Sequence, residues 1–166
     1  MEQDRHILSI ILENTSGSMS RVLGLFSARG YNISSVTAAP TDIPNIARMT
    51  IVTPATPAMI EQITKQLNRI VEVIKVVDLI DNDYVERELM LVKVRALGRE
   101  RDEMLRIAEI FRAHVVDVND KSFTIEVTGD SAKLDAFLKA VDHTSILESV
   151  RTGATGLGRG DRILKV

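Results

Sequence analysis

Residues 12–33 read LENTSGSMSRVLGLFSARGYNI, and this stretch gives the clearest indication of the fold of the first half of the chain. An apolar segment ends at Asn14, a polar loop turns through Gly17, and a helical stripe of apolar residues begins at Met19. Gly30 stands where a glycine commonly ends a helix. The stretch therefore predicts a strand, a loop, a helix and a second strand. The N–H groups at the start of this helix suit an anion.

The segments around this stretch extend the pattern to a βαββαβ module. Apolar and alternating runs predict strands over residues 6–13, 31–39, 47–53 and 71–79. Thr56 followed by Pro57 predicts the start of a second helix, whose apolar face continues to Leu67. A sheet with helices on one face leaves the other face or an edge to be covered, and side-by-side or face-to-face pairing would cover it, so the module also predicts a homodimer.

The second half repeats the order of elements without repeating the residues. Strands are predicted over residues 90–96, 114–118, 123–128 and 146–150. Apolar stripes predict helices that include residues 104–111 and 134–141. The fold class is therefore α+β, with two ferredoxin-like βαββαβ modules. The first covers residues 1–80, a linker covers residues 81–85, and the second covers residues 86–166 with a glycine-rich tail.

Composition excludes several classes of protein. The 166 residues are 45% apolar and 27% charged, and the formal charge of −2 gives no reason to expect nucleic acid or a membrane as a partner. Without cysteine, neither a disulfide nor a thiolate metal site can form. The polar start argues against a signal peptide, and no apolar run reaches the roughly 18 residues of a membrane span. These features predict a cytoplasmic protein.

Other candidate chemistries find little support in the sequence. The histidines at positions 6, 114 and 143 have no ligand spacing, so no metal site is predicted. No nucleophile, base and carboxylate set can be assembled, so no catalytic residue is predicted. The glycines at positions 153, 156, 158 and 160 precede no helix, which favours an exposed docking tail over a phosphate-binding loop. The central strands of the first module lack the aromatic residues that RNA-recognition domains need.

The chain resembles the acetolactate synthase small subunit family over nearly its whole length, from about Arg5 to Ile163. The matching stretches are residues 12–33, 37–42, 48–51, 61–67, 87–94 and 157–161. The resemblance implies an N-terminal ACT domain, which binds an effector and dimerises, and a C-terminal ACT-like domain, which contacts the catalytic subunit. It also implies that the chain is not itself an enzyme.

The resemblance further implies a regulatory function in the biosynthesis of valine, leucine and isoleucine. The chain would activate the large catalytic subunit of acetolactate synthase and confer feedback inhibition by valine, or by leucine or isoleucine. Thiamine diphosphate, magnesium and FAD would belong to the catalytic subunit, and this chain would carry no cofactor. The open alternative is a different amino-acid-sensing ACT regulatory protein.

The effector would bind at the interface between two ACT domains. The residues at the matching positions are Asn14, Ser16, Gly17, Ser18 and Met19 of the loop, Asn32 and Ile33 supplied by the partner chain, and Thr37, Ala39 and Gln62 as neighbours. Backbone N–H groups would hold the effector carboxylate, the two asparagines would bridge its ammonium and carboxylate, and Ile33 and Ala39 would accept its side chain.

A plainer interpretation of these residues also exists. Gly17 and Gly30 suit a turn and a helix cap with no ligand present, and Asn14 is a good loop residue. Asn32 is harder to explain in this way, because asparagine is disfavoured within strands. The helix separates Asn14 from Asn32 by its own length, so the two can meet at one ligand only through a neighbouring chain.

Overall fold

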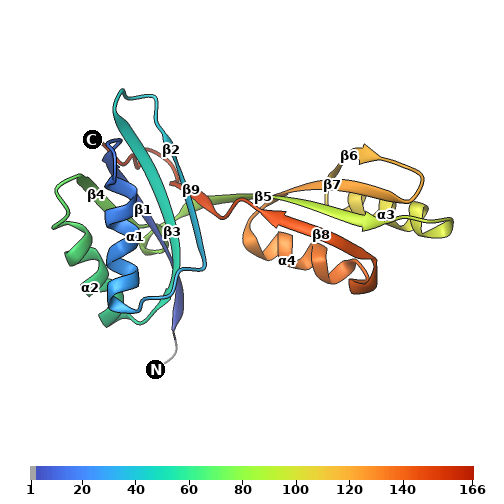
Figure 1. The fold of residues 1–166 in the computed structure, drawn as a ribbon, viewed down its shortest axis with the longest axis horizontal. Coiled ribbons are helices and arrows are strands. Elements are labelled where there is room, and N and C mark those ends of the chain that lie inside the picture. Colours follow the sequence, from blue (N-terminus) through green and yellow to red (C-terminus); the bar gives the residue numbers. More distant parts are fainter. Residues whose placement is uncertain (1–2) are drawn as a thin grey trace. The chain divides into compact units, whose positions relative to one another are not determined.

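The chain, seen in a computed structural model that describes residues 3–166, forms two compact units (Figure 1). The first unit contains the residues up to Val85 together with Ala154–Val166, and the second contains Glu86–Gly153. The second unit is therefore an insertion, which leaves the first unit after Val85 and returns to it at Ala154.

The first unit has the predicted βαββαβ order. Its elements are β1 (Asp4–Glu13), α1 (Ser18–Arg29), β2 (Ser35–Pro40), β3 (Ile46–Ala55), α2 (Pro57–Leu67), β4 (Val73–Asp78) and the 3-10 helix η1 (Leu79–Asp81). The four strands form an antiparallel sheet in the order β2-β3-β1-β4, which leaves β2 and β4 at the edges. This strand order confirms the ferredoxin-like arrangement predicted from the sequence.

Both helices of the first unit cover the same face of this sheet (Figure 1). Alternate residues of β1, namely Leu8, Ile10 and Leu12, are fully buried against Val22 and Phe26 of α1. At about 25 cal/mol per Å², burial of such side chains is the main stabilising contribution to a small unit of this kind. The helix-facing core is therefore the one expected from the period of two in the strand and the helical stripe.

The opposite face of β1 is also buried, although neither α1 nor α2 covers it. Ile7 and Ser9 have no exposed surface, and Ile11 is 4% exposed. Ile7 packs with Val52 and with Ala154, which begins the C-terminal segment of the unit. The C-terminal segment thus supplies part of the cover for the face that the helices leave open.

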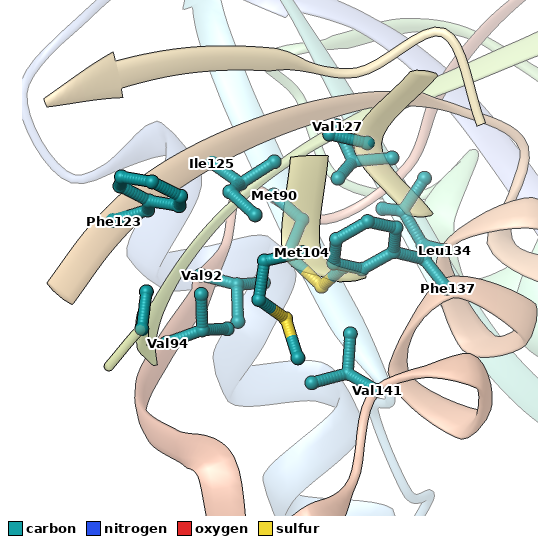
Figure 2. Close-up of a cluster of buried hydrophobic side chains, with 12 residues drawn as sticks. Met90, Val92, Val94, Met104, Phe123, Ile125, Val127, Leu134, Phe137 and Val141 are labelled. Atoms are coloured by element: carbon teal, nitrogen blue, oxygen red, sulfur yellow. The ribbon is translucent and has the colours of Figure 1, made fainter. Parts of the chain in front are cut away.

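The second unit contains most of β5 (Tyr84–Arg95), then α3 (Arg99–Ile110), β6 (His114–Val118), β7 (Ser122–Gly129), α4 (Ser131–Ala140), the 3-10 helix η2 (His143–Ser145) and β8 (Ile146–Arg151). Its strand order is β6-β7-β5-β8, the same topology as in the first unit. Figure 2 shows Met90, Val92 and Val94 of β5 and Met104 of α3 directed into one apolar core. The ring of Phe137 meets that of Phe111 edge to face, at 5.4 Å between centroids.

An ion pair with a buried carboxylate ties the two ends of the second unit together. The carboxylate of Glu88, only 5% exposed, accepts from Nε and Nη2 of Arg151 at 3.0 and 2.8 Å. It also accepts from the N–H of Gly153 at 3.2 Å, while Asp135 accepts from Nη1 of Arg151 at 2.7 Å. These carboxylates hold the pKa of Arg151 well above its usual value, against the effect of burial.

Three details differ from the sequence prediction. Strand β2 begins at Ser35, four residues later than predicted, because residues 31–34 carry the chain from the end of α1 to the sheet edge. Strand β5 already begins at Tyr84, inside the predicted linker. The C-terminal segment packs with the first unit, although the sequence grouped it with the second.

The prediction that the glycine-rich tail is exposed is wrong for part of it. Residues Thr155–Gly158 form strand β9, which pairs with β5. Gly153, Ala154 and Gly156 are buried. A Cβ at position 156 would lie 2.8 Å from Cδ1 of Leu79 and 2.9 Å from the carbonyl oxygen of Val85. The glycine is therefore required by close packing of two backbones. Within residues 3–166, no helix is long and apolar enough to cross a membrane.

Candidate functional site

The loop between β1 and α1 carries the first group of predicted site residues. Asn14 is exposed, and its backbone N–H donates to the carbonyl of Asn45, in the turn between β2 and β3, at 2.8 Å. Gly17 adopts φ of 84°, a left-handed conformation that favours glycine. Ser18 is buried, and its hydroxyl donates to the carbonyl of Thr15 at 2.9 Å. Ser18 thus shapes the loop, whereas Asn14, Ser16 and Gly17 present exposed surface.

The start of α1 has unused hydrogen-bond donors. Gly17 occupies the N-cap position without a side-chain cap, and the first turn contains no acidic residue. In the part of the chain that the structure describes, the backbone N–H groups of Met19 and Ser20 have no partner. Such N–H groups, at the positive end of the helix dipole, are suited to a carboxylate.

A cation that sequence analysis missed lies beside this loop. The guanidinium of Arg21 lies so close to Gly17 that a Cβ there would be 3.2 Å from Nη1. Arg21 also forms an ion pair with Glu72, with Nε 2.8 Å from Oε1. The pair raises the pKa of Arg21 and lowers that of Glu72. The position of Arg21 in the first turn was visible in the sequence, but its partner, 51 residues away, was not.

The second group of predicted residues lies after α1. Asn32 is exposed, and its carbonyl accepts from the hydroxyl of Thr53 at 2.6 Å. Ile33 packs against the helix-facing core. The phenol of Tyr31 donates to Oε1 of Gln62 on α2 at 3.4 Å, which places Gln62 near Asn32.

These two groups lie at opposite ends of the sheet in one chain. The loop follows Glu13, which pairs with Ile46 of β3, whereas Asn32 contacts Thr53 of the same strand. Ile46 and Thr53 are seven residues apart, which is about 23 Å along an extended strand. The structure of one chain therefore does not bring Asn14 and Asn32 together.

Thr37 and Ala39 lie apart from both groups. On β2, Val36 packs toward the helices, so Thr37 and Ala39 belong to the opposite face of the sheet, in register with Thr50 and Arg48. The hydroxyl of Thr37 donates to the carbonyl of Ala154 at 3.3 Å. Thr37 thus contacts the C-terminal segment, whereas Ala39 is exposed.

No group of three or more histidine, cysteine, aspartate or glutamate side chains within residues 3–166 is arranged to hold a metal ion. His6, which is buried, has its Nδ1 at 2.5 Å from Asp78. His114 is mostly exposed and lies 3.8 Å from Glu126.

Two family models match the chain and together cover most of it. Residues 8–75 match the ACT domain of the acetohydroxyacid synthase small subunit, and residues 87–160 match the small subunit of acetolactate synthase. The isozyme 3 small subunit of acetolactate synthase from Escherichia coli K12 is 51% identical, over 97% of this chain and 99% of that protein. The small subunit from Haemophilus influenzae is 50% identical, over 95% and 98%.

A solved structure agrees with these sequence relatives. The crystal structure of the acetolactate synthase small subunit from Thermotoga maritima superposes with a TM-score of 0.87 at 36% identity. The match covers 96% of this chain and 99% of that one. The fold, both halves of the sequence and the extent of the matches lead to one conclusion: the chain belongs to the acetolactate synthase small-subunit family.

Proposed function

We propose that the chain is the regulatory subunit of acetolactate synthase in branched-chain amino acid biosynthesis. It binds the large catalytic subunit, raises its activity and makes it sensitive to inhibition by valine. The single observation that carries this proposal is the match to small subunits over the whole chain, including the C-terminal half. A different amino-acid-sensing ACT regulator would be expected to match only the first half.

This function assigns the catalytic chemistry to the partner. Thiamine diphosphate, magnesium and FAD would be held by the catalytic subunit, and the chain would have neither catalytic activity nor a cofactor of its own. Feedback then requires valine to favour one arrangement of the complex by a coupling free energy of about 1–3 kcal/mol. A cytoplasmic location would follow from this role.

The loop before α1 supplies the proposed carboxylate site. The unpartnered N–H groups of Met19 and Ser20 would donate to the valine carboxylate, and the guanidinium of Arg21 adds positive charge beside Gly17. The exposed amide of Asn14 would complete the polar contacts. Branched-chain side chains differ by single methylene groups, so discrimination among them would be limited to about 1–3 kcal/mol.

The distance between the two asparagines supports a site shared by two chains. About 23 Å of strand separates their surroundings, far more than one amino acid can span. Strand β2 is an edge of the first sheet, so a second copy can pair beside it. In a two-fold dimer, each site would then take Asn14 from one chain and Asn32 from the partner chain.

Calorimetry with valine tests this arrangement in full-length chains, alone and with the catalytic subunit. Asn14→Ala and Asn32→Ala should each abolish the valine heat. Random mixing of these two variants should restore about a quarter of the sites, because each mixed dimer contains one site with neither substitution. Wild-type chain mixed with the double variant is the matched control: its mixed dimers contain no intact site, so only the wild-type dimers, about a quarter of the total, should bind valine, whereas sites within single chains would leave about half intact.

Three results would contradict the proposal. Valine binding that survives Asn32→Ala, or mixing that restores no sites, would exclude the shared site. A catalytic subunit whose activity the chain does not raise would exclude the regulatory function itself.

A further inference from the structure

A cavity of 730 Å³ lies in the first unit, beneath the C-terminal segment. Its walls are formed by the face of β3 and β4 away from the helices, by the end of β4 and the following turn, and by residues 157–165 apart from Arg159. Pockets for small ligands commonly enclose about 300–1,000 Å³. The cavity belongs entirely to the first unit and is separate from the exposed loop before α1.

Arg48 reaches this cavity with part of its hydrogen-bonding capacity unused. The side chain is half-buried, donates from Nε to the hydroxyl of Ser9 at 2.8 Å and from Nη2 to the carbonyl of Gly156 at 3.3 Å. Both acceptors are neutral, and a guanidinium has five N–H donors in all. Burial without a counter-charge lowers the pKa of Arg48.

Lys75 adds a second cation without a partner. It lies on β4 opposite Ile11, which in turn pairs with Arg48 across β1 and β3. Within residues 3–166, neither Lys75 nor Arg48 forms an ion pair. The two cations therefore stand on the same face of the sheet, with one strand between them, and both line the cavity.

The carboxylates around the cavity do not neutralise these cations. Asp78 is engaged elsewhere, because its carboxylate contacts Nδ1 of His6 at 2.5 Å and accepts from the N–H groups of Ile7 and Ile80. The other acidic lining residues are Asp83 and Asp161, and the tail contributes two further cations, Arg162 and Lys165. A partly buried, unpaired charge is costly, so an anionic ligand would relieve an existing electrostatic penalty.

We propose that this cavity binds a small anion, a carboxylate or a phosphate, between Arg48 and Lys75. The planar guanidinium of Arg48 suits bidentate contact with either group, and Lys75 supplies a point charge. The donors are side chains, so the site needs no glycine-rich phosphate loop. The inference does not depend on the regulatory function proposed above.

Titration of the full-length chain with inorganic phosphate, and separately with malonate, tests the site at fixed ionic strength and distinguishes phosphate from carboxylate. Saturable binding of one of them at millimolar concentration is expected. Arg48→Met should weaken that binding at least about tenfold, as expected for loss of a charge-assisted contact. Arg69→Met, an exposed arginine of the same unit outside the cavity lining, is the matched control and should bind as the wild type does.

Lys75→Met is a second test, which stays informative if the Arg48 variant does not fold. Lys75 is exposed and has no ion pair, so its loss should weaken anion binding about threefold or more while leaving the unfolding midpoint unchanged. Because residues 157–165 include most of the cavity wall, bound anion should also slow tryptic cleavage after Arg162. No binding of either anion to the wild type, or binding by the Arg48 and Lys75 variants as tight as that of the wild type, would overturn the proposal.

Discussion

Gly156→Ala should loosen the C-terminal segment from the first unit. The added Cβ would lie 2.8 Å from Cδ1 of Leu79 and 2.9 Å from the carbonyl oxygen of Val85, and the second contact is with backbone that cannot rotate away. Overpacking of this kind typically costs about 1–3 kcal/mol. Alanine also lowers the conformational entropy of the unfolded chain. This stabilises the folded protein by about 0.4–1 kcal/mol, since the φ of Gly156 is not positive. The expected net loss is about 1–2 kcal/mol.

Urea unfolding of the full-length chain, combined with amide hydrogen exchange, measures this loss. Exchange should accelerate at Arg159, whose N–H donates to the carbonyl of Asp83 at 2.9 Å, because this bond depends on the docked tail. Gly24→Ala is the control: a Cβ there meets nothing within 4 Å, and the helical position should gain about 0.5–1 kcal/mol. Wild-type stability and unchanged protection in Gly156→Ala would refute the packing argument.

Three further predictions concern a buried carboxylate, a turn and an ion pair. Glu88→Gln should destabilise the second unit by about 2 kcal/mol in urea unfolding, because it leaves the guanidinium of Arg151 partly unpaired; an unchanged midpoint would contradict this. Gly17→Ala should lower the free energy of unfolding by about 1 kcal/mol, because residue 17 has φ of 84°. It should also weaken the valine binding measured by calorimetry, and wild-type affinity would count against the loop site. Arg21 lowers the pKa of Glu72, so their contact is present at neutral pH and is lost as the pH falls through that lowered value; Arg21→Met should raise the carboxyl midpoint in carbon NMR, and a constant midpoint would exclude the contact.

Local patterns were enough to predict most of the fold. The alternation of Leu8, Ile10 and Leu12 gives the buried face of β1, and the stripe through Val22 and Phe26 gives the buried face of α1. Both depend on the period of the backbone itself, which is why a single sequence shows them. The repeated element order then gave the second unit with the same topology.

Long-range contacts explain what the sequence did not show. Strand β9 is four residues long and contains two glycines, so it has no alternating apolar pattern. It is held by distant partners, such as the bond from Arg48 to the carbonyl of Gly156, 108 residues away. No local signal marks such a contact, and a glycine-rich segment resembles an exposed loop until its neighbours are known.

The candidate site likewise combines residues that local sequence patterns predicted with a contact that they did not predict. The loop before α1 was predicted from its asparagine and glycine, because turns and helix starts favour particular residue types at neighbouring positions. The ion pair of Arg21 with Glu72 was missed, because it joins a helix start to the beginning of a distant strand. The assignment of Asn14, Asn32 and their neighbours to one effector stays a prediction, since it depends on a second chain.

The position of Thr37 and Ala39 shows most clearly that the proposed effector loop and the proposed anion site lie on different faces of the first sheet. Both were assigned to the effector by resemblance, but the hydroxyl of Thr37 is already bound to the carbonyl of Ala154, and Ala39 pairs with Arg48. They stand on the sheet face away from the helices, where Thr37 contacts the C-terminal segment, whereas the loop leads to the helices on the other face. If substitutions at Thr37 and Ala39 change valine binding, we expect them to act across the dimer and not through the loop of their own chain. Both residues lie on β2, the edge where we propose that a second copy pairs. Strand β2 thus carries both the edge proposed for the dimer and, at Thr37, a contact with the C-terminal segment.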